Sequence, residues 1–149
     1  MVSIPPRPVS FLSVVSCGYA STAWPIEVGW GFGTGPVRSM LLVPTEDWSL
    51  LAWDKHCEGG HRVALETLVR EGKKPLDAAL VLNAALGQST VYAQDPKTDS
   101  LWLYKLYKAA KVDPNFQLEP SAIDIEPLPA RASARVEALR SAFTARAAS

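Results

Sequence analysis

The sequence contains few of the residues that build disulfide frameworks or metal clusters. Its 149 residues include two cysteines, Cys17 and Cys57, and two histidines, His56 and His61. Two widely spaced cysteines make a poor disulfide framework, and no Cys/His cluster has the spacing of a zinc site. We therefore expect two reduced thiols in a cytoplasmic protein, because stable disulfides are rare in that compartment.

Long apolar runs and an excess of charge of either sign are also absent. No stretch reaches the roughly 18–20 apolar residues of a membrane-spanning helix, so we expect no membrane partner. The first ten residues carry one arginine and three prolines, unlike a signal peptide, in which a basic region leads directly into an apolar one. Fifteen basic residues balance fifteen acidic ones, so any basic surface for nucleic acid must be local.

The remaining composition is that of an ordinary globular domain. Hydrophobic residues make up 48% of the chain and charged residues 20%, which is typical of one domain with a real core. Pro5, Pro6 and Pro8 forbid a helix and weaken any strand ladder. We expect an extended lead-in over residues 1–10 and a single domain over residues 11–149.

Strand and helix patterns alternate along that domain. Short apolar runs separated by glycine-containing turns predict an antiparallel meander of three strands, and segments of helical period follow. The order βββ, αα, β, α, β, α predicts an α/β fold with a mixed five-stranded sheet flanked by helices. The expected strands cover residues 11–15, 26–32, 37–43, 90–93 and 116–119, and the expected helices cover 63–71, 75–86, 98–110 and 131–147.

Helical spacing also predicts which side of each helix is buried. Thr98 or Asp99 is the expected cap of the third helix, and Lys105, Lys108 and Lys111 are expected to share a polar face of it. The expected inward residues are Leu65, Leu68 and Val69 in the first helix, Leu76, Leu80, Val81 and Ala84 in the second, and Leu101, Trp102, Leu106 and Ala109 in the third.

One motif makes the sequence resemble a known family. The run Trp24-Pro25-Ile26-Glu27-Val28-Gly29-Trp30 follows a short strand and a turn at Gly18. With this run the chain resembles the 3′–5′ exonucleases of the DEDD superfamily, particularly the DnaQ-like or RNase T-like branch. Trp53-Asp54 followed by His61, and residues 82–86, match in register, although Arg62 stands where the family has glycine. The resemblance implies a ribonuclease H-like fold over residues 10–145.

The resemblance also implies where a catalytic site would lie. The family uses two divalent cations held by carboxylates, and a histidine that takes a proton from the attacking water. Its four acid positions fall on Ser13, Val15, Asp99 and Arg135, and its histidine position falls on Ala130. Because Mg²⁺ and Mn²⁺ need several oxygen ligands and negative charge, we expect no catalytic residue, no metal site and no Mg²⁺ or Mn²⁺ cofactor. We further hypothesise that Arg135 pairs with Asp99 in the vacated space.

Two other polar residues have alternative interpretations. Glu27 lies inside the second strand and is either a leftover metal ligand or a scaffold residue that pairs with backbone or with an arginine. The histidines fall in a loop, away from the family's histidine position, and are interpreted as loop residues without a catalytic role. A Ser13 nucleophile would need an adjacent base, so a small buried polar residue is the simpler interpretation.

Three functions stay open from the sequence. The first is a catalytically inactive domain that binds single-stranded nucleic acid, through stacking on Trp24 and through phosphate contacts. The second is a protein-interaction module, with a homodimer as one form, because five tryptophans offer aromatic interface area. The third is a functional metal-dependent 3′–5′ exonuclease with a non-standard site. The candidate nucleic-acid-binding residues are Trp24, His61, Lys97, Arg131 and Arg135, with the lysine face of the third helix beside them.

Overall fold

The computed structural model describes residues 7–18, 22–46, 48, 53 and 60–147. The predictions for residues 1–6, for His56 and Cys57, and for most of residues 44–60 lie outside this part of the chain. The elements are β1 (Val9–Ser16), β2 (Pro25–Phe32), β3 (Arg38–Leu41), α2 (Leu65–Glu71), α3 (Pro75–Leu86), β4 (Thr90–Ala93), α4 (Pro96–Ala110), β5 (Leu118–Pro120) and α5 (Ala132–Ala147).

These strands form one five-stranded sheet in the order β3-β2-β1-β4-β5. The β1–β2 and β2–β3 pairs are antiparallel, whereas β4 is parallel to both β1 and β5. The predicted antiparallel meander, the mixed α/β sheet and the order of elements are therefore confirmed. None of the helices in the described residues is long and apolar enough to cross a membrane.

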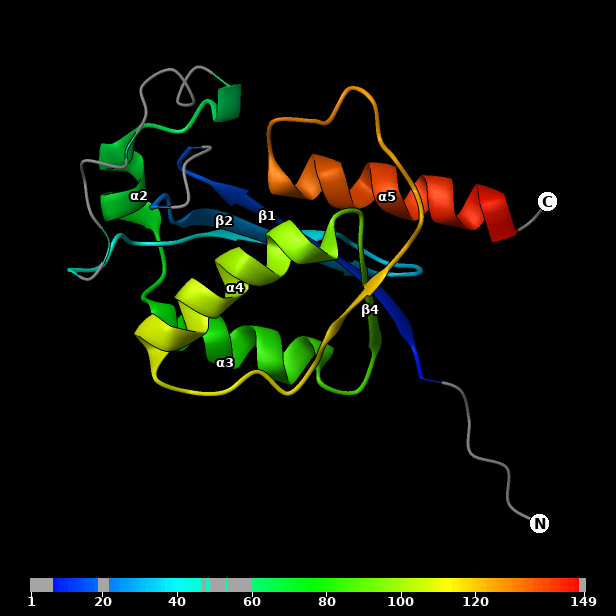
Figure 1. Cartoon of the computed structure of the whole chain (residues 1–149), viewed down its shortest axis with the longest axis horizontal. Coiled ribbons are helices and arrows are strands. Elements are labelled where there is room, and N and C mark those ends of the chain that lie inside the picture. Colours follow the sequence, from blue (N-terminus) through cyan, green and yellow to red (C-terminus); the bar gives the residue numbers. More distant parts are fainter. Residues whose placement is uncertain (1–6, 19–21, 47, 49–52, 54–59, 148–149) are drawn as a thin grey trace, which may run out of the picture.

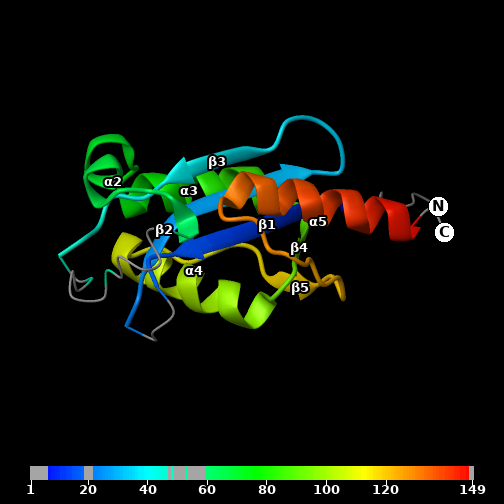
Figure 2. The ribbon, with the colours of Figure 1, turned by 90° about the horizontal axis from the view of Figure 1, so that it is seen from above.

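Helices cover the sheet on both faces. Figure 1 shows α5 on one side of the strands and α3 with α4 on the other, and Figure 2 shows α5 lying along the sheet from above. Because side chains alternate along a strand, Leu12 joins the main core beneath α3 and α4, while Phe11 faces α5. Phe11 packs there with Val136 and Leu139, which forms a second, smaller core.

Some expected boundaries are corrected by the structure. β1 begins at Val9, inside the expected lead-in, because Val9 pairs with Thr90 of the parallel strand β4. Helix α4 begins at Pro96, and its cap is Asp95, whose side chain accepts a hydrogen bond from the Thr98 nitrogen at 3.3 Å. Thr98 and Asp99 therefore lie in the first turn, and proline suits that turn because it has no N–H to leave unpaired.

The predicted buried side of α3 is wrong. Leu76, Leu80 and Ala84 are exposed and Val81 is half-buried. The buried side consists of Ala78, Ala79, Leu82 and Leu86. Small alanines allow α3 to approach α4 closely, and the Tyr107 hydroxyl of α4 reaches the Ala79 carbonyl oxygen at 3.3 Å.

The buried sides of α2 and α4 are predicted in part. In α2, Leu68 is buried and Val69 is exposed. In α4, Trp102 and Leu106 are buried as expected, while Leu101 is exposed and Leu103 and Tyr107 point inward. The expected lysine face is also divided, because half-buried Lys105 donates to the Ala23 carbonyl, while Lys108 and Lys111 are exposed.

The run over residues 24–30 explains how α5 attaches to the sheet. Buried Glu27 accepts three charge-assisted hydrogen bonds from Arg131, the shortest at 2.6 Å, and a fourth hydrogen bond at 2.8 Å from the nitrogen of Ala132, where α5 begins. A Cβ on Gly29 would lie 2.8 Å from the Ala132 carbonyl carbon, so only glycine permits this approach. Of the two interpretations of Glu27, the arginine-paired scaffold residue is confirmed.

Arginines of α5 attach the rest of the helix. Arg140 Nη1 donates to the carbonyl oxygens of Phe32 and Gly35 at 3.0 and 2.8 Å. Arg146 Nη1 donates to the carbonyl of Ala122 at 2.9 Å. The basic composition of this helix therefore serves the fold, because the guanidinium groups bind backbone carbonyls of neighbouring segments.

Candidate functional site

A cleft of about 440 Å³ lies at the C-terminal end of β1, between α4 and the segment that leads into α5. All five positions carried over from the exonuclease family line it. Residues far apart in the sequence are therefore brought together as the resemblance implies. Those five residues are Ser13, Val15, Asp99, Ala130 and Arg135.

Asp99 is the carboxylate that projects from α4 toward β1. Its side chain is buried, and Oδ1 accepts a hydrogen bond from the Val14 nitrogen at 3.2 Å. Burial raises the pKa of Asp99 from 3.8 to about 7, against the opposing effects of the Val14 hydrogen bond and the Arg135 charge. The negative charge of Asp95 raises this pKa further. Asp99 therefore changes its charge near neutral pH.

Arg135 approaches the same strand residue from α5. Its Nε donates to the Pro129 carbonyl oxygen at 2.6 Å, and Nη1 lies 3.4 Å from the carbonyl oxygen of Val14. Arg135 and Asp99 are close enough to interact electrostatically, but the ion pairs formed among the described side chains do not include this pair. The hypothesis of a direct ion pair is therefore corrected, since each group instead binds the backbone of Val14.

The residues of this cleft do not fit two divalent cations. Val15 supplies only hydrocarbon, Ser13 supplies a neutral hydroxyl, and Arg135 supplies a positive charge where a third ligand would be needed. Asp95 also lines the cleft, but its carboxylate caps α4 and accepts from the Thr98 hydroxyl at 2.7 Å. Within residues 7–18, 22–46, 48, 53 and 60–147, no group of three or more potential ligands could hold a metal.

His61 lines the cleft from residues 60–61, which are helical, so the expectation that it falls in a loop is corrected. Its ring is buried, its Nδ1 accepts from the Val63 nitrogen at 3.1 Å, and its edge meets Trp53 with ring centroids 5.3 Å apart. The neighbouring Arg62 has φ +60°, a left-handed conformation that favours glycine. Arg62 therefore holds a backbone conformation that glycine would adopt more easily.

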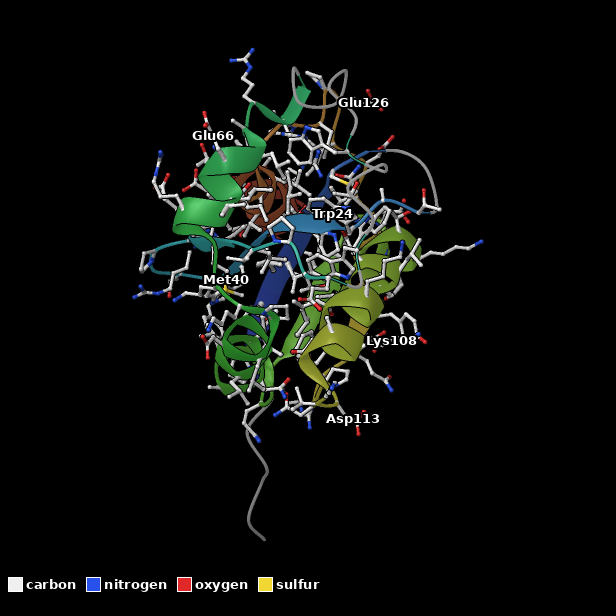
Figure 3. All side chains as sticks on the ribbon, turned by 90° about the vertical axis from the view of Figure 1, so that its left-hand side faces the viewer. Trp24, Met40, Glu66, Lys108, Asp113 and Glu126 are labelled. Carbon is white, nitrogen blue, oxygen red and sulfur yellow. The ribbon has the colours of Figure 1, made fainter. Side chains whose placement is uncertain are left out.

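Trp24 does not reach the cleft. It is 1% exposed and packs between Trp48 and Trp53, with ring centroids 5.6 and 5.7 Å away. Figure 3 labels Trp24 near the centre of the molecule. Stacking of an incoming base on Trp24 is therefore corrected, because neighbouring rings already cover it.

The other basic candidates have separate positions. Arg131 is bound to Glu27 and belongs to the attachment of α5. Lys97 is exposed in the first turn of α4, next to Thr98, which lines the cleft. Arg135 and His61 thus line the cleft, Lys97 is not among its lining residues, and Trp24 and Arg131 serve other contacts.

Several residues that line the cleft were not predicted from the sequence. Gln94, at the end of β4, donates from Nε2 to Asp124 at 3.3 Å, and its Oε1 is buried with no hydrogen-bond partner among the described residues. Trp102 and Leu128 add apolar surface. The pair Asp95-Pro96 could have indicated this part of the cleft, because an aspartate cap followed by proline marks the start of a helix.

Comparisons with known proteins give a structural likeness without a sequence match. No family model matches the chain, and no curated protein sequence matches it. The zinc-bound complex of E. coli exonuclease I with single-stranded DNA is similar, with a TM-score of 0.72 and 10% identity over 93% of this chain and 40% of that one. Product-bound exonuclease I has a TM-score of 0.63 and 8% identity over 78% of this chain and 30% of that one.

The apo form of exonuclease I is also similar in structure, with a TM-score of 0.64 and 8% identity over 78% of this chain and 29% of that one. This chain spans less than half the length of those structures. At such identities the likeness concerns the fold alone. Together with the sheet order and the helix placement, it shows that the chain has the ribonuclease H-like α/β fold of exonuclease I.

Proposed function

We propose that this chain is a catalytically inactive exonuclease-like domain that binds an end of single-stranded nucleic acid in its cleft. The observation that carries the proposal is the contact of Arg135 with the Val14 carbonyl, on the strand residue whose nitrogen binds Asp99. A fixed guanidinium beside the remaining acid replaces the concentration of negative charge that two-metal hydrolysis needs.

The absence of hydrolysis follows from this donor set. Three of the four acid positions hold Ser13, Val15 and Arg135, and the histidine position holds Ala130. We propose that no Mg²⁺ or Mn²⁺ is held between them. Asp99 and Asp95 are the carboxylates among the residues that line the cleft, and burial and mutual repulsion favour the protonated form of Asp99.

Binding is supported by the shape and polar groups of the cleft. The structurally similar exonuclease I is bound to single-stranded DNA in one of its structures. In this chain, Arg135 supplies a charge that suits phosphate, and exposed Lys97 precedes Thr98, which lines the cleft. The buried Gln94 Oε1 accepts no hydrogen bond among the described residues, so a ligand with an N–H donor, such as a base, would satisfy it.

Binding is tested by fluorescence anisotropy with 5′-labelled single-stranded DNA and RNA at low and moderate salt. Phosphate contacts predict that the wild type binds and that affinity falls as salt rises. Arg135→Glu should weaken binding by about tenfold or more, and Arg70→Glu, which reverses an exposed arginine on α2, should not. Absence of binding by the wild type at low salt would contradict the proposal. Because Arg135 also contacts backbone, each variant is checked for thermal stability, and Lys97→Glu supplies a second test next to Thr98 of the cleft.

The alternative function is a metal-dependent 3′–5′ exonuclease with a non-standard site. Asp95 and Asp99 would be its available carboxylates. A nuclease assay with Mg²⁺ and with Mn²⁺ on highly purified protein decides between the two. Degradation from the 3′ end that disappears in Asp99→Asn would establish the alternative and overturn the inactive domain.

The protein-interaction alternative rests on exposed apolar side chains. Val69 of α2 and Leu76 and Leu80 of α3 are 46–63% exposed, which is unusual for three large apolar residues on neighbouring helices. For this alternative we propose that the protein is cytoplasmic and forms a homodimer. Light scattering tests it, and a strict monomer whose mass does not depend on concentration would contradict it.

A further inference from the structure

A second hollow lies on the side of α4 away from the cleft. It has a volume of about 680 Å³ and lies between the C-terminal half of α4 and residues 112–118. The helical period places Thr98 and Trp102 on one side of α4 and Tyr104 and Lys108 on another. We call this hollow the aromatic groove, and its main residues are Leu103, Tyr104, Tyr107, Lys108, Lys111 and Phe116.

The wall opposite α4 is fixed by one side chain of α3. Asn83 Nδ2 donates to the Asp113 carbonyl oxygen at 3.0 Å, and Asn83 Oδ1 accepts from the Asn115 nitrogen at 3.3 Å. The same Oδ1 accepts from the Tyr107 hydroxyl at 2.8 Å, on the α4 side. Both walls are therefore joined through Asn83, and a groove formed in advance spares a ligand the cost of ordering it.

The floor and the rim of the groove differ in chemistry. Tyr107 and Phe116 meet edge to face, with ring centroids 6.3 Å apart, next to Leu103. Above them, Tyr104 is 63% exposed, and Lys108 Nζ lies 5.9 Å from its ring centroid. An apolar floor with a few polar groups at the edge is the usual composition of a small-molecule site.

Lys111 is held in an uncommon conformation at this rim. It ends α4 with φ +60°, and its nitrogen donates to the Tyr107 carbonyl oxygen at 2.9 Å. Glycine is the usual residue at such a helix end, because other side chains disfavour the left-handed region. A lysine here places a second positive charge on the groove, where the fold itself would prefer glycine.

We propose that the aromatic groove is a second binding site, specific for a nucleotide, with the planar base against Tyr104 and Phe116 and the phosphate on Lys108 and Lys111. Aromatic rings beside lysines suit a ligand that combines a flat ring with an anion. The two lysines outweigh Asp113 on the same rim and the negative end of the α4 dipole. Figure 3 shows Lys108 and Asp113 at the same end of α4.

Asp113 gives the site a second means of recognition. A carboxylate at the rim accepts hydrogen bonds from ribose hydroxyls or from an amino group of a base, whereas it repels a bare phosphate. The groove should therefore bind a whole nucleotide better than either half of it. This site goes beyond nucleic-acid binding in the cleft and does not depend on it, because the two sites share no lining residue.

The test uses the full chain, with AMP, adenosine and inorganic phosphate as separate probes. Binding of each probe is measured by NMR chemical-shift titration at millimolar concentrations. The wild type should bind AMP more tightly than adenosine or phosphate. Tyr104→Ala should weaken AMP binding by roughly fivefold to a hundredfold, the range of base stacking on an aromatic ring. Lys108→Glu should weaken AMP binding and leave adenosine binding unchanged.

Two variants serve as controls. Lys74→Glu reverses an exposed lysine before α3, outside the groove, and should bind AMP as the wild type does. Arg135→Glu changes the cleft and none of the residues of the groove, so a folded variant should still bind AMP even if it no longer binds a strand in the cleft. The proposal would be overturned if the wild type did not bind AMP, or if Tyr104→Ala and Lys108→Glu bound AMP as tightly as the wild type. It would also be overturned if Arg135→Glu were the only variant to lose AMP binding.

Discussion

Asp99 and Arg135 meet at one residue of the sheet, Val14, where Asp99 binds its N–H and Arg135 its carbonyl oxygen. The Asp99 carboxylate accepts the Val14 N–H at 3.2 Å, and Arg135 Nη1 lies 3.4 Å from the Val14 carbonyl oxygen. Helices α4 and α5, which lie on opposite faces of the sheet, are thereby connected through β1. In a two-metal enzyme, cations would hold mutually repelling carboxylates together in this space. In this chain, Asp99 and Arg135 instead bind the backbone of Val14.

The first prediction concerns the stability of the protein against pH. Burial raises the pKa of Asp99 from 3.8 to about 7, so between these values the folded protein holds a proton that the unfolded chain has released. The free energy of unfolding should therefore fall as pH rises from about 4 to about 7. Asp99→Asn keeps an acceptor for the Val14 nitrogen and removes the charge, so it should be the more stable protein above pH 7, by about 4 kcal/mol.

Urea unfolding at pH 5 and pH 8 measures this effect. The difference between Asp99→Asn and the wild type should be clearly smaller at pH 5 than at pH 8, because the fall in wild-type stability is only partly complete at pH 5. Asp77→Asn, in the first turn of α3 and exposed, is the matched control. A variant that is equally destabilised at both pH values would show that Asp99 acts through packing and not through its charge.

The second prediction concerns the attachment of α5. Glu27→Ala removes the partner of Arg131 and the acceptor of the Ala132 nitrogen. Arg131 is 44% exposed and its charge stays solvated in the variant, so the main cost is the unpaired Ala132 nitrogen, which should lower the free energy of unfolding by about 1–3 kcal/mol. Amide hydrogen exchange should then rise in α5 before it rises in α3. Exposed Glu119→Ala is the control, and uniform exchange throughout the chain would contradict a local role.

The sequence predicted the cleft better than it predicted the helix faces. The resemblance placed Ser13, Asp99 and Arg135 around one site because the order of strands and helices determines which segments meet. The resemblance did not predict which atoms those side chains bind. Asp99 and Arg135 were expected to pair directly, but both bind the backbone of Val14, and such a contact leaves no pattern in the sequence.

Helix α3 shows why burial was harder to predict. Leu76 and Leu80 form one apolar stripe and Ala78, Ala79 and Leu82 form another, so the period alone cannot choose between them. The choice is made by the neighbouring α4, which packs against the small alanines. Trp24 is a similar case, since its ring is covered by Trp48 from a distant loop.

The third prediction concerns the close approach of α5 to β2. A Cβ at Gly29 would lie 2.8 Å from the Ala132 carbonyl carbon and 2.9 Å from its oxygen, and both are backbone atoms that cannot turn away. Gly29→Ala should therefore push the start of α5 outward and lower the free energy of unfolding by about 1–3 kcal/mol. Gly33→Ala is a close control, because a Cβ there meets nothing within 4 Å. Equal stability of the two variants would contradict the contact.

The fourth prediction concerns Arg62, which lies between His61 and Val63 at the cleft. Its φ of +60° costs a residue with a Cβ about 1 kcal/mol or more, and glycine adopts this conformation freely. Glycine also gives the unfolded chain more freedom, which offsets part of the gain. Arg62→Gly should therefore raise the free energy of unfolding by about 0.5–1 kcal/mol. Arg70→Gly, in the last turn of α2, should lower it by a similar amount because glycine is unfavourable within a helix. A loss of stability in Arg62→Gly would instead show that the Arg62 side chain contributes more to the loop than its backbone conformation costs.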